Sequence, residues 1–183
     1  NDFIICCGYK GYIIKEYFAN YFLHTSNVTF DLKENKIEYH ESFVEPWKIT
    51  LIDTGLNTMT GGRLKRVEKF INGDTFCMTY GDGLSDVNIT ELIKFHKQNK
   101  SEATITAVKP PGRFGALSLR GDFQVTSFQE KPVGEVGWIN GGFFVLNKSV
   151  IRRIDNDDSI WEDKPLSTLA NDNKLSAYIH RGF

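Results

Sequence analysis

The sequence has few cysteines and no motif that would use them to bind a metal. Its 183 residues include three cysteines and four histidines, with no C-x-x-C pair and no histidines at the spacing of zinc ligands. Cys6 and Cys7 are adjacent, and neighbouring strand residues point to opposite faces, so these thiols are poorly placed to share a metal. We therefore expect buried thiols in a reducing cytoplasm, and no zinc enzyme.

An excess of one charge and a long apolar run are also absent. The 22 basic and 23 acidic residues give a formal net charge of −1, so nucleic acid and anionic membranes are not attracted in general. No apolar run approaches the ~20 residues of a membrane span, and no basic region precedes the first apolar run as in a signal peptide. A P-loop and a G-x-S-x-G motif are missing too. We expect a cytoplasmic protein without nucleic-acid or membrane partners.

What the sequence does have is an alternation of apolar runs and helical patterns. Hydrophobic residues make up 40% of the chain and the five prolines are spread out, which predicts one domain over residues 1–183. Buried strands are expected at 2–7, 75–80 and 103–108, and helices at 13–22 and 88–99. Asn88 and Glu91 have the spacing of a capping box. This rhythm predicts an α/β fold in which helices flank a mixed, mostly parallel sheet.

The segment 28–54 and the last third of the chain have other patterns. Alternating runs at 28–32, 36–40 and 47–53 predict a small antiparallel excursion. Further expected elements are a loop at 54–62, a helix at 63–71, a hairpin over 114–128, a strand at 138–146, short helices at 149–154 and 165–170, and a strand at 175–180. Asp155, Asp157 and Asp158 form an acidic turn, for which we expect a solvated loop.

Two glycines lead directly into the helix expected after residue 62. Gly61 and Gly62 precede Arg63, and exposed N–H groups at a helix start beside a guanidinium suit an anion or a nucleobase edge. An ordinary flexible loop with a surface arginine explains the same residues, so the motif alone leaves both interpretations open.

A carboxylate flanked by glycines follows the strand expected at 75–80. Ligands of open α/β sheets bind at the carboxyl ends of strands, and Asp82 offers the hard oxygen that Mg²⁺ prefers there. A turn aspartate that bonds its own backbone is the alternative. Leu84 excludes a D-x-D motif.

Two later strand ends carry polar residues of the same kind. Glu130 and Lys131 stand beside a proline, where a solvated turn or a site for a sugar hydroxyl and a phosphate are both consistent with the pattern. Asn140 precedes Gly141 and Gly142 inside an expected strand. Glycines in a strand indicate either a β-bulge or a close approach to the backbone, and the asparagine amide can bond a pair of hydroxyls.

In this order the motifs resemble those of the sugar-phosphate nucleotidyltransferases. The resemblance covers essentially the whole chain and implies a Rossmann-like nucleotidyltransferase fold. The matching stretches are 2–22, 44–47, 53–55, 59–67, 79–83, 110–117, 127–132, 139–147 and 154–157. The order of Thr-Gly-Gly-Arg and Tyr-Gly-Asp-Gly is similar to that in members that use CTP and glucose 1-phosphate to make CDP-glucose for bacterial surface polysaccharide, such as O-antigen.

The resemblance implies nucleotide and metal contacts. Thr58 and Arg63 would lie in the nucleotide-contacting loop, and Gly81 and Asp82 at the reaction centre. Asp82 would bind Mg²⁺. The residues that would present backbone to the base or the phosphates are Thr60, Gly61 and Gly62.

The resemblance also implies a sugar-phosphate site. Gly115 would approach the sugar, while Glu130 and Lys131 would bind the glucose hydroxyls and the 1-phosphate. The hexose pocket would be lined by Asn140, Gly141 and Gly142. Together with Asp82, the cations Arg63 and Lys131 are the expected catalytic groups.

Two segments of the family pattern have no counterpart here. The family opens with a glycine-rich, Arg-containing loop and a Lys-Pro segment that wrap the triphosphate, and a second metal-binding Asp follows a segment like 179–183. We therefore expect the chain to be truncated at both ends, an incomplete domain that is inactive by itself. The family also implies a homo-oligomer.

Three alternatives stay open at this point. The first is a nucleotidyltransferase that uses UTP or dTTP, which a nucleotide panel separates. The second is a glycosyltransferase on a similar sheet, which usually needs the D-x-D motif that is absent here. The third is a non-catalytic relative that binds nucleotide or sugar without releasing pyrophosphate.

Overall fold

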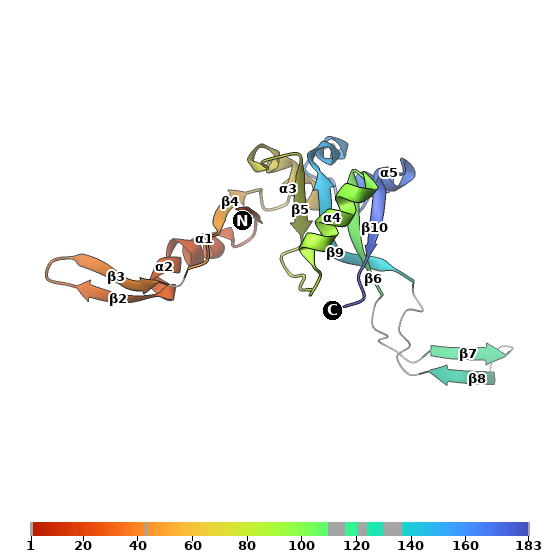
Figure 1. Ribbon diagram of the computed structural model, residues 1–183, viewed down its shortest axis with the longest axis horizontal. Coiled ribbons are helices and arrows are strands. Elements are labelled where there is room, and N and C mark those ends of the chain that lie inside the picture. The colour runs from red at the N-terminus through yellow and green to blue at the C-terminus, as the bar shows by residue number, and fades with distance from the viewer. Residues whose placement is uncertain (1, 43, 110–115, 121–123, 130–136, 183) are drawn as a thin grey trace. The chain divides into compact units, whose positions relative to one another are not determined.

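The computed structural model describes residues 2–42, 44–109, 116–120, 124–129 and 137–182 (Figure 1). The chain divides into two compact units. The first unit comprises Asn1–Asn72 and Ile154–Lys164, and the second comprises Gly73–Arg153 and Pro165–Phe183. Among the described residues, no helix has the length and hydropathy needed to cross a membrane.

The first unit is built around a pair of parallel strands. Its elements in chain order are β1 (Asp2–Cys7), α1 (Gly11–Ala19), α2 (Tyr21–Thr25), β2 (Ser26–Asp31), β3 (Lys36–Ser42), β4 (Lys48–Asp53), α3 (Thr60–Arg66) and the 3₁₀ helix η1 (Glu68–Phe70). β1 pairs with β4 in parallel, with Phe3 beside Ile49. The prediction that residues 47–53 belong to the antiparallel excursion was therefore wrong, because an alternating pattern reports one covered face but not which strand is the partner.

The excursion itself is a two-stranded hairpin that follows α2 (Figure 1). β2 and β3 pair antiparallel, with Val28 opposite Tyr39 and Phe30 opposite Ile37. Residues directly opposite each other share a face, so these four side chains form one apolar face. Phe30, Ile37 and Tyr39 are each about half exposed.

Much of the apolar surface expected in the core of the first unit is exposed. The strand at 2–7 is confirmed, but Phe3 is 46% exposed and only Cys7 of β1 is buried. The expectation of buried thiols holds only for Cys7, since Cys6 and Cys77 are exposed. An apolar run shows only that a strand can be covered on both faces, and here Phe3 and Cys6, which point to opposite faces of β1, are both exposed.

The second unit contains a four-stranded sheet. The elements that follow η1 are β5 (Thr75–Thr79), α4 (Ile89–Asn99), β6 (Ala103–Val108), β7 (Ala116–Arg120), β8 (Gln124–Gln129), β9 (Ile139–Asn147), the 3₁₀ helix η2 (Lys148–Arg153), α5 (Lys164–Asn171) and β10 (Leu175–Ile179). The strand order is β10-β6-β9-β5. β10 is parallel to β6, and β9 is antiparallel to both β6 and β5. Three of the four strands therefore run the same way, although two of the three pairings are antiparallel, and the prediction of a mixed sheet is confirmed.

The core of the second unit lies where α4 packs on this sheet (Figure 1). Leu92 of α4 and Phe144 of β9 are both 1% exposed. The predicted helix cap is confirmed, because the backbone N–H of Glu91 donates to Asn88 Oδ1 over 3.1 Å. The insertion of β9 between β5 and β6 places the start of β9 beside the carboxyl ends of its neighbours, which matters for the site.

Candidate functional site

The first part of the predicted site is the loop between β4 and α3. Thr54, the first loop residue, is fully buried, and both its N–H and its Oγ1 donate to the carbonyl oxygen of Cys7 at the end of β1, over 2.8 and 2.9 Å. Thr58 is also buried. The loop that resembles a nucleotide-contacting segment is therefore tied to the end of the parallel strand pair.

Arg63 supports this loop from α3. Its Nη1 donates to Thr54 Oγ1 over 2.7 Å and to the Cys7 carbonyl over 3.3 Å, and its Nη2 donates to the Leu56 carbonyl over 3.3 Å. The guanidinium thus joins β1, the loop and α3. Its predicted contact with a nucleotide stays a prediction, while its role in holding the loop is visible in these bonds.

Gly61 and Gly62 lie in the first turn of α3, which begins at Thr60 rather than Arg63. A Cβ on Gly61 would lie 2.7 Å from the Ser159 carbonyl oxygen, and one on Gly62 would lie 2.6 Å from Asp157 Cα. The Gly62 N–H donates to the Ser159 carbonyl over 3.2 Å. The two glycines allow segment 157–161 to approach α3 closely, and one of the helix-start donors is already used by that segment.

Further bonds attach the same segment to the start of α3. The Met59 N–H donates to the Asp157 carbonyl over 2.8 Å. Thr60 Oγ1 donates to Glu162 Oε2 and accepts from the N–H of Trp161, both over 2.9 Å. Trp161 is fully buried, so the segment is an integral part of the first unit.

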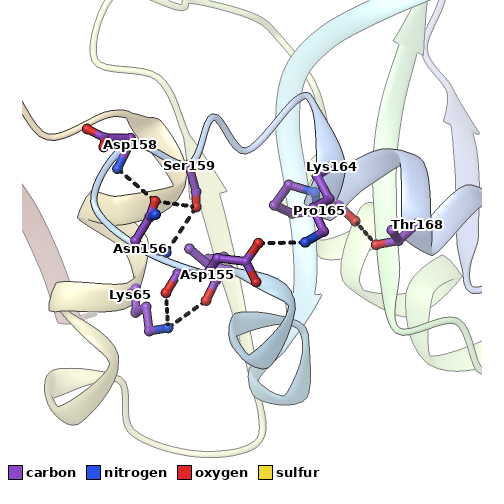
Figure 2. A network of polar contacts seen from close by, with 9 residues as sticks. Lys65, Asp155, Asn156, Asp158, Ser159, Lys164, Pro165 and Thr168 are labelled. Atoms are coloured by element: carbon purple, nitrogen blue, oxygen red, sulfur yellow. Dashed lines mark hydrogen bonds and ion pairs between the residues drawn. The ribbon is translucent and has the colours of Figure 1, made fainter.

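The acidic turn is exposed to solvent, as expected, but two of its carboxylates are paired with basic side chains. Arg66 donates from Nε and Nη2 to the two carboxylate oxygens of Asp157, over 2.9 and 2.5 Å. Lys164 pairs with Asp155 over 2.6 Å, and Lys65 Nζ donates to the carbonyls of Ile154 and Asp155 (Figure 2). Hydrogen bonds from Arg66 and Lys164 lower the pKa of Asp157 and of Asp155 respectively. Sequence reasoning missed these pairs because Arg66 and Asp157 are 91 residues apart.

The second part of the predicted site lies at the carboxyl edge of the four-stranded sheet. β5 ends at Thr79, and the exposed Asp82 follows within three residues. β9 begins at the same edge, since Thr79 is opposite Phe143 and Val108 is opposite Ile139. Asn140, Gly141 and Gly142 therefore lie next to the chain that leaves β5.

The asparagine and the two glycines form a bulge beside Tyr80. Asn140 Oδ1 accepts from the Gly142 N–H over 2.8 Å, and Asn140 Nδ2 donates to the Tyr80 hydroxyl over 3.4 Å. The register shifts between Ile105 and Ala107 of β6, which shows the bulge, one of the two interpretations that the sequence left open. Gly142 has a φ of +79°, and a Cβ on Gly141 would lie 2.9 Å from Val108 Cγ1, so both glycines are required by the protein itself.

A further pair at this edge was missed by the sequence analysis. His180 Nε2 lies 2.8 Å from Asp86 Oδ1, and the His180 N–H donates to the Ala107 carbonyl over 2.9 Å. These residues are 94 positions apart, and no spacing motif joins them. The bond attaches the segment after Asp82 to the end of β10.

Three predicted site residues, Gly115, Glu130 and Lys131, lie outside the described residues. The other predicted residues fall into two sets. Thr58, Thr60, Gly61, Gly62 and Arg63 belong to the first unit, and Gly81, Asp82, Asn140, Gly141 and Gly142 to the second. Within the described parts of the chain, no three His, Cys, Asp or Glu side chains gather as a metal cage.

Known proteins resemble this chain in sequence and in fold. The profile of the family described as nucleotidyl transferase matches residues 21–180. The chain is 61% identical over 183 residues to the glucose-1-phosphate cytidylyltransferase of Salmonella typhimurium and 60% identical to that of Salmonella typhi, covering 100% of this chain and 71% of each relative. The crystal structure of HddC from Yersinia pseudotuberculosis aligns with a TM-score of 0.63 and 23% identity, over 100% of this chain and 71% of that one. At that identity the likeness concerns the fold alone.

Proposed function

Because the chain belongs to the nucleotidyl transferase family, we propose that it transfers the cytidylyl group of CTP to α-D-glucose 1-phosphate. The products are CDP-glucose and pyrophosphate. The observation that carries this proposal is the 61% identity with the Salmonella typhimurium enzyme, which extends over every residue of the chain.

The reaction is a displacement at the α-phosphorus of CTP. An ionised phosphate oxygen of glucose 1-phosphate forms the new P–O bond, and the bond from the α-phosphorus to the oxygen bridging it to the β-phosphate breaks. The attacking oxygen is already deprotonated at neutral pH, so no general base is required. The obstacle is repulsion between two anions, and positioning together with charge neutralisation is how such transfers are catalysed.

Nucleotidyl transferases generally use a divalent metal, and we propose Mg²⁺ with Asp82 as its protein ligand. The exposed Asp82 carboxylate lies beside Gly81, where a Cβ would meet no atom within 4 Å. Such an open position fits Mg²⁺, which takes one or two carboxylates and completes its shell with water and substrate phosphates. When bound, the metal supplies neutralisation of phosphate charge.

The residues of the chain divide the remaining work. The proposed nucleotide-binding residues are Thr58, Thr60, Gly61, Gly62, Arg63 and Gly81. The proposed sugar-phosphate-binding residues are Gly115, Glu130, Lys131, Asn140, Gly141 and Gly142. Asn140 supports this division, because its amide stands at the carboxyl edge of the sheet with one donor and one acceptor function already oriented by Tyr80 and Gly142.

We also propose that the protein is a cytoplasmic homo-oligomer that supplies CDP-glucose for surface polysaccharide such as O-antigen. An isolated two-stranded hairpin is marginal in water, and the apolar face of β2 and β3 carries Phe30, Ile37 and Tyr39 about half exposed. Burial of this face between subunits would stabilise the hairpin. Light scattering on the purified protein measures the assembly directly, and a monomer at micromolar concentration contradicts it.

The decisive experiment measures pyrophosphate release and nucleotide-sugar formation with glucose 1-phosphate, Mg²⁺ and each of CTP, UTP, dTTP, ATP and GTP. It uses the protein in its natural full length. Release with CTP well above the others, together with CDP-glucose in the product, is the expected result. Preference for UTP or dTTP would replace the nucleotide assignment, and nucleotide binding without release would identify a non-catalytic relative.

A further inference from the structure

The acidic turn reaches the nucleotide-contacting loop through a chain of side-chain bonds. Asp157 holds the Arg66 guanidinium with both carboxylate oxygens, over 2.9 and 2.5 Å. The remaining terminal nitrogen of Arg66, Nη1, donates to the Thr54 carbonyl over 3.1 Å. Thr54 Oγ1 in turn accepts from Arg63 Nη1. The carboxylate of Asp157 therefore fixes the orientation of the residue that begins the loop.

Backbone contacts reinforce the same connection at the other end of the loop. The Asp157 carbonyl accepts from the Met59 N–H over 2.8 Å, one residue before α3 begins. The side chain of Asp157 thus acts on the start of the loop at Thr54, while its backbone acts on the end of the loop. Gly62 has no Cβ that would push this backbone away.

The turn is itself rigidly built, which makes it a suitable support. Asn156 Oδ1 accepts from the Asp158 N–H over 3.1 Å and from Ser159 Oγ over 3.2 Å, and Ser159 Oγ accepts from the Asn156 N–H (Figure 2). Lys164 and Lys65 hold its first residue, Asp155. A turn closed by its own bonds and held by two lysines does not need Arg66 to keep its shape.

We propose that Asp157 and Arg66 are positioning residues that set the geometry of loop 54–59 for the nucleotide, so that affinity for CTP depends on this pair although neither residue is assigned a contact with substrate. The inference rests on the proposed function, because it takes CTP as the ligand of this loop. A planar guanidinium is needed, because one group must bond a carboxylate in bidentate fashion and a carbonyl at the same time.

The second unit offers a matched control. Arg153 pairs with Asp172 over 2.6 Å, and the Asp172 side chain is 54% exposed compared with 52% for Asp157. Arg153 also contacts Glu102 at the amino end of β6, away from the carboxyl edge that carries Asp82. Asp172→Ala therefore removes an Asp–Arg ion pair of similar exposure without touching loop 54–59.

The experiment measures KM for CTP, KM for glucose 1-phosphate and kcat for the full-length protein and for Asp157→Ala, Arg66→Lys and Asp172→Ala. Calorimetric titration with CTP alone gives the dissociation constant without turnover. We expect Asp157→Ala and Arg66→Lys to raise both KM for CTP and the dissociation constant for CTP roughly fivefold to tenfold, because the loop loses its geometry. KM for glucose 1-phosphate should stay within about twofold, and Asp172→Ala should match the unmodified protein.

A double variant adds a readout that general destabilisation does not produce. If Asp157 acts through Arg66, the double variant Asp157→Ala with Arg66→Lys should weaken CTP binding no more than the stronger single change does. If the two residues act independently, the two fold-changes in the dissociation constant should multiply. Asp157→Asn keeps one acceptor oxygen, so we expect it to weaken CTP binding less than Asp157→Ala does.

Several results would overturn the inference. The first two are an equal loss of affinity for CTP and for glucose 1-phosphate, and an unchanged CTP affinity in Asp157→Ala. The other two are a loss of CTP affinity in Asp172→Ala as large as that in Asp157→Ala, and fold-changes that multiply in the double variant. The proposed function fails separately, when the unmodified protein binds CTP but forms no CDP-glucose. In that case the calorimetric comparison still decides whether Asp157 and Arg66 set the loop.

Discussion

The two units hold their predicted site residues by different means. In the first unit, individual side chains from distant segments fix the loop, as when Arg63 joins Thr54 to the end of β1. In the second unit, the positions of Asn140 and Tyr80 follow from the pairing of β9 with its neighbours. A strand ladder distributes its constraint over many backbone bonds, whereas a guanidinium concentrates it in one residue. In the first unit, a single side-chain substitution should therefore displace the neighbouring site residues. In the second unit, a substitution should remove the functional group of that residue and leave its neighbours in place.

The largest effect is expected in the second unit, from Asp82→Asn. The exposed carboxylate takes no part in the strand ladder, so Asp82→Asn should remove the charge that we propose as the metal ligand and leave the fold intact. Turnover should fall on the order of a hundredfold to a thousandfold, with an unchanged melting temperature. Steady-state kinetics over a range of Mg²⁺ concentrations and thermal unfolding measure both. Normal turnover would remove Asp82 from the metal site.

Next in size is a contrast between one glycine of each unit. A Cβ on Gly62 would collide with the backbone of Asp157, whereas a Cβ on Gly81 would meet no atom within 4 Å. Gly62→Ala should lower the free energy of unfolding by roughly 1–3 kcal/mol through overpacking, and Gly81→Ala should change it by less than about 0.5 kcal/mol. Urea unfolding of both variants provides the test. Equal stabilities would mean that segment 157–161 moves aside at no cost.

A smaller effect separates the two substrates. Arg63→Ala removes the guanidinium that holds the loop of the first unit, and Asn140→Ala removes the amide at the sheet edge of the second. We expect KM for CTP to rise about tenfold in the former, and KM for glucose 1-phosphate to rise about tenfold in the latter, as for loss of one or two strong hydrogen bonds. Initial rates at varied concentrations of each substrate distinguish them. Should both variants affect both substrates alike, the assignment of Arg63 to CTP and of Asn140 to glucose 1-phosphate is wrong.

How far the sequence predicts the structure differs between the units for a physical reason. In the second unit the strands and the Asn88 cap are confirmed, because they depend on local periodicity and local bonds. Of the two interpretations of Gly141 and Gly142, the structure shows the bulge. The predicted pairing of β4 was wrong, because tertiary packing decides which strand is the partner and an alternating pattern does not encode it.

The same reason explains what was missed at the site. Arg66 with Asp157 and Asp86 with His180 are contacts between residues more than 90 positions apart, and charge patterns within a short window contain no information about them. Asp82, by contrast, was located from the end of a predicted strand, because the carboxyl ends of strands in α/β sheets are general ligand positions. Its role as a metal ligand stays a prediction.

The smallest effect concerns pH and again belongs to the first unit. Arg66 lowers the pKa of Asp157, so the folded carboxyl has a lower pKa than the unfolded one. The stabilisation is fully present above the unfolded value of about 3.9 and is lost as pH falls through the lower folded value. Unfolding free energies of the unmodified protein and Asp157→Asn should differ by a constant amount between about pH 5 and 7 and converge below about pH 4.

Asp155→Asn should behave likewise because Lys164 lowers the pKa of Asp155. Both differences should shrink in high salt, since these pairs are exposed. A difference that stays constant through acid would mean that the ion pair contributes nothing and that the backbone bonds of the turn hold the loop alone.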